Sequence, residues 1–116
     1  MVTRVDHIDL RVADVEKFVE QFKMLGFIEI RRIPEPRLSI EIALPGENQM
    51  IIEVRTAKEG ESGINHVAFK VDSTETISEL KEKGIEFKSE NRLVKDTGRS
   101  VSNFKDPFGN SWQLTD

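Results

Sequence analysis

The sequence of 116 residues contains no cysteine and no tyrosine, and it has one tryptophan. Without cysteine, the chain can form no disulfide bond, no thiolate metal site and no cysteine nucleophile. Long apolar runs are also missing, since no stretch approaches the roughly 20 residues that a membrane-spanning helix needs. The absence of cysteine is compatible with a reducing compartment, and the chain opens on a strand-like segment that is no signal peptide. We therefore expect a cytoplasmic protein that does not enter a membrane.

The chain also lacks a large excess of either charge. Lys and Arg total 17 and Asp and Glu total 21, which gives a formal net charge of −4. Basic residues are interspersed with acidic ones, and neither a basic block nor a motif for stacking aromatic rings on bases is present. The sequence therefore predicts no nucleic-acid partner. Its length fits one domain with a real hydrophobic core.

What the sequence does contain is an internal repeat. Residues 5–12 (VDHIDLRV) and residues 64–71 (INHVAFKV) align with an offset of 59 residues, which places His7 on His66. Both segments alternate apolar and polar residues, which is the pattern of a half-buried strand. These are the two histidines of the chain. The repeat therefore predicts two related modules, each with one histidine at the same point of its first strand.

A helix is predicted after each of these two strands, because apolar residues follow at helical spacing. Asp14 is the expected N-cap of the first helix, and Ser73 or Thr74 that of the second. Gly26 and Gly84 are expected just past the two helix ends, where a left-handed residue commonly closes a helix.

Three further strands are predicted in each half, at residues 27–33, 38–44 and 49–55 and at residues 85–90, 98–104 and 110–115. The segment Asp106-Pro107-Phe108-Gly109 before the last strand has the residue order of a type I turn. The polar segment 56–63 is the expected linker. We therefore predict one α+β domain over residues 1–116. It consists of two βαβββ modules, about 4–55 and 64–115, each a mostly antiparallel curved sheet covered by a helix.

Strand parity predicts which side chains share a face of each sheet. The apolar residues expected beneath the helices include Ile8, Leu10, Val12, Met50, Ile52, Val54, Val67, Phe69, Trp112 and Leu114. The opposite face carries His7, Glu53, His66 and Gln113. If the two sheets curve toward one another, these four side chains can converge. Two imidazoles, a carboxylate and an amide oxygen suit a divalent ion such as Zn, Ni, Co, Mn or Fe.

Other interpretations of the polar face stay open at this point. Each histidine can be an ordinary strand residue, Glu53 a solvated one, and Gln113 one of the amides that are common on exposed strands. Arg11, Arg55 and Lys70 lie on the same faces and can either bind an anionic substrate or be ordinary surface charges.

Four segments of the sequence resemble the vicinal oxygen chelate superfamily, which includes glyoxalase I, the bleomycin-resistance proteins and the extradiol dioxygenases. These segments are Val5-Asp6-His7-Ile8-Asp9-Leu10, Ile51-Ile52-Glu53-Val54, Asn65-His66-Val67-Ala68-Phe69 and Asp106-Pro107-Phe108-Gly109-Asn110-Ser111-Trp112-Gln113-Leu114. They occur in the family's order over nearly the whole chain. The resemblance implies paired βαβββ modules, and often a homodimer. It also implies a metal-lined cleft with His7, Glu53, His66 and Gln113 as ligands.

The sequence departs from the family pattern at Gln113, where many catalytic members have glutamate. Glutamine cannot accept a proton at neutral pH, so Glu53 is the ligand expected to act as the general base. The leading hypothesis is a metal-dependent lyase or isomerase, similar to glyoxalase I or an epimerase, that acts on a small oxygenated substrate through an enediolate-type intermediate. A non-catalytic protein that binds a drug or small molecule and an extradiol dioxygenase are the alternatives.

Overall fold

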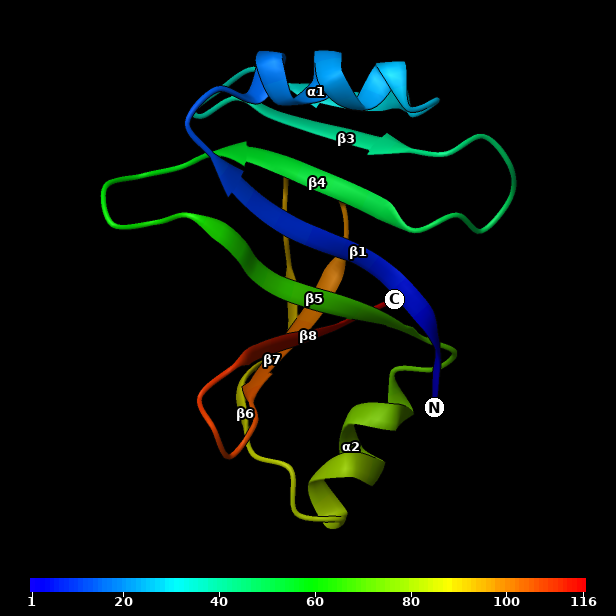
Figure 1. The fold of residues 1–116 in the computed structure, drawn as a ribbon. Helices are drawn as coiled ribbons and strands as arrows, with labels where there is room; N and C mark the ends of the chain where they lie inside the picture. Colours follow the sequence, from blue (N-terminus) through cyan, green and yellow to red (C-terminus); the bar gives the residue numbers. More distant parts are fainter. The chain divides into compact units, whose positions relative to one another are not determined.

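The computed structural model describes all 116 residues and contains two helices and eight strands (Figure 1). The chain divides into two compact units, which we call the first unit, residues His7–Asn65, and the second unit, residues Met1–Asp6 with His66–Asp116. Both helices are too short and too polar to cross a bilayer. The predicted α+β class is confirmed, and each unit contains one helix and one set of four strands.

In the first unit the strand order is β2-β3-β4-β1. The two pairs β2–β3 and β3–β4 are antiparallel, while β1 and β4 are parallel. The elements are β1 (Val2–Val12, of which the part from His7 onward belongs to this unit), α1 (Val15–Met24), β2 (Ile28–Ile33), β3 (Ser39–Ala43) and β4 (Ile51–Thr56). Helix α1 lies along one face of these strands (Figure 1).

The core of the first unit lies between α1 and strands β3 and β4. Its fully buried residues are Val15, Val19, Ile40, Ile42 and Val54. The helix begins as predicted, because the Asp14 carboxylate accepts a hydrogen bond from the backbone N–H of Lys17 at 3.0 Å. This bond satisfies one of the amide groups that have no partner within the first turn.

The second unit repeats this plan with the strand order β5-β8-β7-β6. Again the β6–β7 and β7–β8 pairs are antiparallel and β5–β8 is parallel. Its elements are β5 (Gly63–Val71, of which the part from His66 onward belongs to this unit), α2 (Glu75–Glu82), β6 (Phe87–Leu93), β7 (Ser100–Lys105) and β8 (Ser111–Thr115). The core is smaller, with Val71, Ile77 and Leu114 buried and Phe69, Leu80, Phe87 and Phe104 packed around them.

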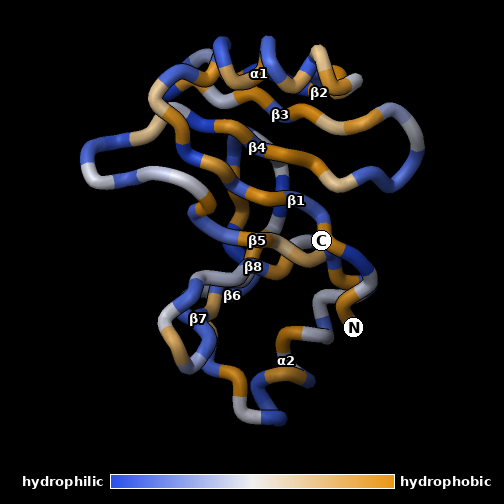
Figure 2. Tube along the Cα trace, in the orientation of Figure 1, coloured by the Kyte–Doolittle hydropathy of each residue, from blue (hydrophilic) through white to orange (hydrophobic).

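Several details differ from the sequence predictions. Met50 precedes β4 and is 37% exposed, because the strand begins at Ile51, two residues after the predicted start. Trp112 is half-buried and stacks on Phe69 with ring centroids 5.6 Å apart, outside the central cluster. The linker is shortened to residues 57–62, because Thr56 extends β4 and Gly63 begins β5. This loop is largely hydrophilic, as Figure 2 shows.

The turn before β8 has the hydrogen bond expected of a β-turn, from the Gly109 N–H to the Asp106 carbonyl at 3.1 Å. The Asp106 carboxylate also accepts bonds from the backbone N–H groups of Phe108 and Asn110 and from the indole N–H of Trp112 at 3.1 Å. Hydrogen bonds to the ionised form, with those from the Asn110 and Trp112 side chains the largest, lower the pKa of Asp106 to about 2.

The low pKa of Asp106 predicts a pH-dependent contribution to stability. Its folded pKa lies below the ordinary value of 3.8, so the stabilisation is complete above pH 3.8 and is lost as the pH falls through about 2. We expect Asp106→Asn to be less stable than the wild type at pH 6, and this difference to shrink steadily between pH 4 and pH 2. Urea titrations followed by Trp112 fluorescence would measure it. The attribution to Asp106 would be contradicted if the stability difference between variant and wild type stayed constant with pH. It would also be contradicted if Glu86→Gln, on the exposed surface, gave the same pH-dependent difference.

Candidate functional site

His7 and Glu53 lie on the same face of the first unit, the face opposite α1. The parallel register of β1 and β4 sets His7 beside Ile51, Asp9 beside Glu53 and Arg11 beside Arg55. Residues directly opposite share a face, so the predicted parity of both strands is correct. Both candidate ligands are buried, with His7 at 2% and Glu53 at 4% exposure. The interpretation of Glu53 as a solvated strand residue is therefore excluded.

A row of three carboxylates crosses this face, and we call it the carboxylate row. Asp9 on β1 is directly opposite Glu53 on β4, and Glu53 is directly opposite Glu41 on β3. All three are buried, with exposures between 2% and 4%. Sequence reasoning did not single out Asp9 or Glu41 for a role in the site. The signal was available, because Glu41 alternates with the core residues Ile40 and Ile42 and therefore faces away from the helix.

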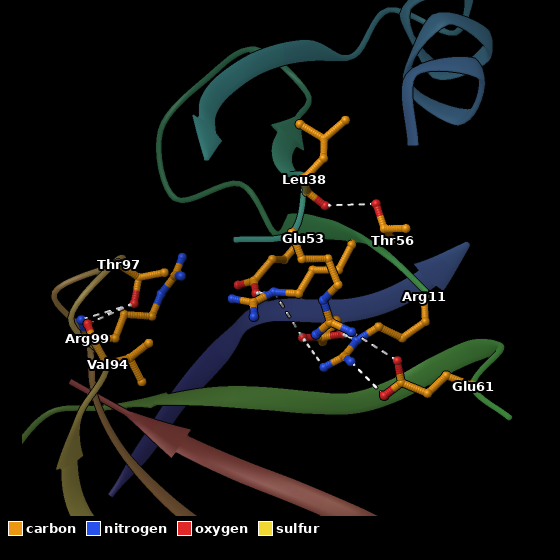
Figure 3. A network of polar contacts seen from close by, with 11 residues as sticks. Arg11, Leu38, Glu53, Thr56, Glu61, Val94, Thr97 and Arg99 are labelled. Carbon is orange, nitrogen blue, oxygen red and sulfur yellow. Dashed lines mark hydrogen bonds and ion pairs between the residues drawn. The ribbon is translucent and has the colours of Figure 1, made fainter. Parts of the chain in front are cut away.

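Arginine side chains form ion pairs with two of the three carboxylates of the carboxylate row, Asp9 and Glu53. Arg55 Nε donates to Glu53 Oε1 at 2.6 Å, and Arg11 Nε donates to Asp9 Oδ1 at 2.5 Å. Arg11 also bonds to Glu61 of the linker at 2.8 Å, as Figure 3 shows. Arg11 and Arg55, which the sequence offered as weak candidates for substrate binding, are thus ion-paired to carboxylates of the chain. Their role toward a substrate stays a prediction.

Burial is the main cause of a raised pKa at Glu53, because it disfavours the charged carboxylate. Arg55 and His7 act against the shift, whereas the negative charges of Asp9 and Glu41 add to it. At Arg11 burial lowers the pKa, but the interactions with Asp9 and Glu61 outweigh burial. The pKa of Arg11 is therefore raised, and its guanidinium group stays positively charged. A carboxylate with a raised pKa is a stronger base than an exposed one, and it can take up a proton more readily.

In the second unit, His66 and Gln113 likewise share a face. Gln113 on β8 is directly opposite Ala68 on β5, and His66 is two residues before Ala68 on the same side of the strand. Gln113 is 7% exposed, whereas His66 is half-buried. Lys70, the third weak substrate candidate, follows Ala68 on this face and is opposite Thr115.

Gln113 belongs to a second polar row, which we call the amide row. Gln113 is directly opposite Asn103 on β7, and Asn103 is directly opposite Ser89 on β6. Gln113 Nε2 donates to Asn103 Oδ1 at 3.0 Å, and Asn103 Nδ2 donates to Ser89 Oγ at 2.8 Å. The amide row stands at the position in the second unit that Glu53 and Glu41 occupy in the first, and it is uncharged. The prediction from sequence had identified only its Gln113 member.

The four predicted metal ligands are divided between the units, two in each, so the complete site stays a prediction. No three His, Asp or Glu side chains of the chain form a group that could hold a metal ion. The donor set nevertheless has the chemistry of a divalent site, with two imidazoles and two oxygen donors. Gln113 fits this set, because its Nε2 is engaged with Asn103 and its Oε1 is the atom that can coordinate.

The family model described as the Glyoxalase/Bleomycin resistance protein/Dioxygenase superfamily matches residues 4–114. The chain belongs to this superfamily. The match covers both modules and all four candidate ligands, and it confirms the resemblance inferred from the sequence motifs. Among curated proteins, no relative matches the chain.

Solved structures show the same fold. A methylmalonyl-CoA epimerase from Streptomyces coelicolor, in complex with 2-nitronate-propionyl-CoA, is 16% identical with a TM-score of 0.79, and the alignment covers 99% of this chain and 97% of that one. The methylmalonyl-CoA epimerase from Mycobacterium tuberculosis is 20% identical with a TM-score of 0.78, covering 98% and 87%. Homoprotocatechuate 2,3-dioxygenase from Brevibacterium fuscum is 16% identical with a TM-score of 0.75, covering 99% of this chain and 34% of that one.

Proposed function

We propose that this protein is a metal-dependent isomerase or lyase that moves a proton on the carbon next to a carbonyl group, with a coenzyme A thioester as its substrate class. The observation that carries the proposal is the buried carboxylate of Glu53, whose pKa is raised and which shares a face with His7. Similarity to two methylmalonyl-CoA epimerases supports the thioester. We further propose that the two modules act as one domain, in a cytoplasmic homodimer.

His7, His66 and Gln113 would hold a divalent ion, and Glu53 would complete the ligand set. When bound, the ion would supply positive charge for the oxygen on which negative charge develops during the reaction. Its identity among Zn, Ni, Co, Mn and Fe is part of the proposal to be tested. Asn103 holds the amide of Gln113 through Nε2, which leaves the oxygen for this role.

Glu53 would act as the base. In the proposed step the C–H bond beside the carbonyl breaks, the proton goes to the Glu53 carboxylate, and the electron pair moves onto the carbonyl oxygen. The carboxylates of Asp9 and Glu41 favour protonated Glu53. Return of the proton from Glu53 to the same face of the carbon would regenerate the substrate, whereas a proton from solvent that adds to the opposite face would give the epimer.

Metal binding is the most direct test of the proposal. We expect protein purified without chelator to contain a divalent metal, and titration with Zn, Ni, Co and Mn to give one site per chain. The double variant His7→Ala/His66→Ala should lose this site, because it removes both imidazoles. A matched control is Glu20→Ala/Glu79→Ala, which changes one exposed residue on each helix and should bind like the wild type.

Circular dichroism would establish that the histidine double variant is folded, and His66→Ala alone is a milder variant, because His66 is only half-buried. Wild-type protein that binds no metal more tightly than the folded histidine variant would overturn the metal-dependent mechanism. Solution mass, measured on the same samples, should correspond to two chains; a single-chain mass would overturn the homodimer.

A further inference from the structure

The amide row of the second unit holds Gln113 in one orientation. Gln113 is buried, Asn103 and Ser89 are half-buried, and the strand registers β8–β7 and β7–β6 set the three side chains opposite one another. The hydrogen bonds of 3.0 Å and 2.8 Å run in a single direction, from Gln113 to Asn103 and from Asn103 to Ser89. A glutamine amide has a donor end and an acceptor end, and this arrangement occupies the donor end.

The corresponding positions in the first unit carry carboxylates in place of neutral amides. Glu53 on β4 is directly opposite Glu41 on β3, just as Gln113 on β8 is directly opposite Asn103 on β7. A carboxylate presents an oxygen whichever way it turns, so Glu53 needs no partner to select its coordinating atom. A glutamine turned by half a rotation presents an NH₂ group, which cannot bind a metal ion. The amide therefore requires an orienting neighbour at the position where the carboxylate does not.

We propose that Asn103 is a positioning residue that keeps the Oε1 atom of Gln113 available to a divalent metal ion. This inference rests on the proposed metal site. It concerns how Gln113 is kept in the orientation in which its side-chain oxygen can bind the ion. Asn103 acts as the hydrogen-bond acceptor that selects the orientation, and Ser89 holds Asn103 in place by accepting from its Nδ2. Outer partners of metal ligands contribute about 10-fold to 100-fold to metal affinity in proteins.

Two substitutions at residue 103 distinguish a role in orienting the Gln113 amide from a role in filling space. Asn103→Asp keeps an acceptor opposite Gln113 Nε2, so metal affinity should stay within about threefold of the wild type or increase. Asn103→Leu has a similar volume and no acceptor, so the affinity should fall by about 10-fold to 100-fold. Gln113→Ala should lower the metal affinity at least as much as Asn103→Leu does. Competition with a chromophoric chelator, using Zn and Ni, would measure all four proteins.

A second readout needs no metal. In ¹⁵N spectra of the metal-free protein, one Nε2 proton of Gln113 should exchange slowly with solvent in the wild type and in Asn103→Asp, and rapidly in Asn103→Leu. This difference reports the hydrogen bond itself and distinguishes loss of orientation from loss of fold, which the remaining backbone signals would reveal.

The possible results separate this inference from the proposed function. Asn103→Leu with wild-type affinity, beside a weakened Gln113→Ala, would overturn the positioning role and leave the metal site intact. Wild-type affinity in Gln113→Ala would overturn the inference, even where the histidine double variant fails to bind. No metal binding by the wild type would overturn both the metal-dependent function and this inference. Weak binding by Asn103→Leu with retention in Asn103→Asp supports the proposal.

Discussion

Glu53→Gln is expected to slow solvent-proton exchange beside the carbonyl of a thioester substrate by about 10²-fold to 10⁴-fold, the usual contribution of a general base. The substitution removes the group that accepts the proton, because a glutamine amide is not basic at neutral pH. It keeps the side-chain volume and one oxygen that can coordinate. The measurement is incorporation of deuterium from D₂O into methylmalonyl-CoA, followed by NMR.

The effect should be on the rate of exchange more than on folding. Glu53 is buried and its pKa is raised, so the ionised carboxylate is itself disfavoured by its surroundings. In the variant Arg55 can still donate to the amide oxygen of residue 53, and it keeps the charged carboxylate of Asp9 at 3.8 Å. We therefore expect Glu53→Gln to fold.

A suitable control for this experiment is Glu47→Gln, which makes the same chemical change at an exposed residue of the loop between β3 and β4. It should exchange the substrate proton at the wild-type rate. Exchange in Glu53→Gln at the wild-type rate would reject Glu53 as the base. If metal binding in this variant is unchanged, the metal site would stand and the base would have to be sought elsewhere.

Ile42→Ala is expected to lower the free energy of unfolding by about 2–5 kcal/mol, the range for removing a large aliphatic side chain from a packed core. Ile42 is completely buried and belongs to the cluster that joins α1 to β3 and β4. Its truncation removes apolar contacts and leaves a cavity that the surrounding strands cannot fill, because both neighbours of β3 are hydrogen-bonded to it.

The matched control is Ile28→Ala on β2, where the side chain is 50% exposed. We expect it to cost less than about 1 kcal/mol, since little apolar surface returns to water. Urea denaturation of both variants, monitored by circular dichroism, gives the two free energies. Equal losses would show that the α1–β3–β4 cluster is not the main stabilising core of the first unit.

The two units stabilise the polar side chains on their sheet faces by different interactions. In the first unit the carboxylate row is buried, and two of its members, Asp9 and Glu53, are ion-paired with the guanidinium groups of Arg11 and Arg55. In the second unit the uncharged side chains of the amide row form hydrogen bonds with one another. Burying a charge is costly unless it is paired, whereas a hydrogen-bonded amide avoids most of that cost. The difference between Glu53 and Gln113 thus extends to the residues beside them.

The sequence by itself determined the repeat, the order of the elements and the faces of the strands. These are local properties, because a period of two or of 3.6 residues and the position of a cap depend on neighbours along the chain. The offset from His7 to His66 was enough to predict equivalent positions, and parity was enough to place Glu53 on the same face as His7. The Asp14 cap and the turn at Asp106 were predictable for the same reason.

Only the tertiary structure decided what stands beside each of these residues. The pairings of Glu53 with Glu41, and of Gln113 with Asn103, depend on the register between strands that are separated in sequence by loops. The choice of Arg55 as the partner of Glu53 depends further on how a long side chain turns within its own strand. The period of two along a strand determines which residues share a face, whereas the residue that lies opposite also depends on the turns between strands and on packing across the sheet. The sequence therefore located the candidate residues, and the fold assigned them their neighbours.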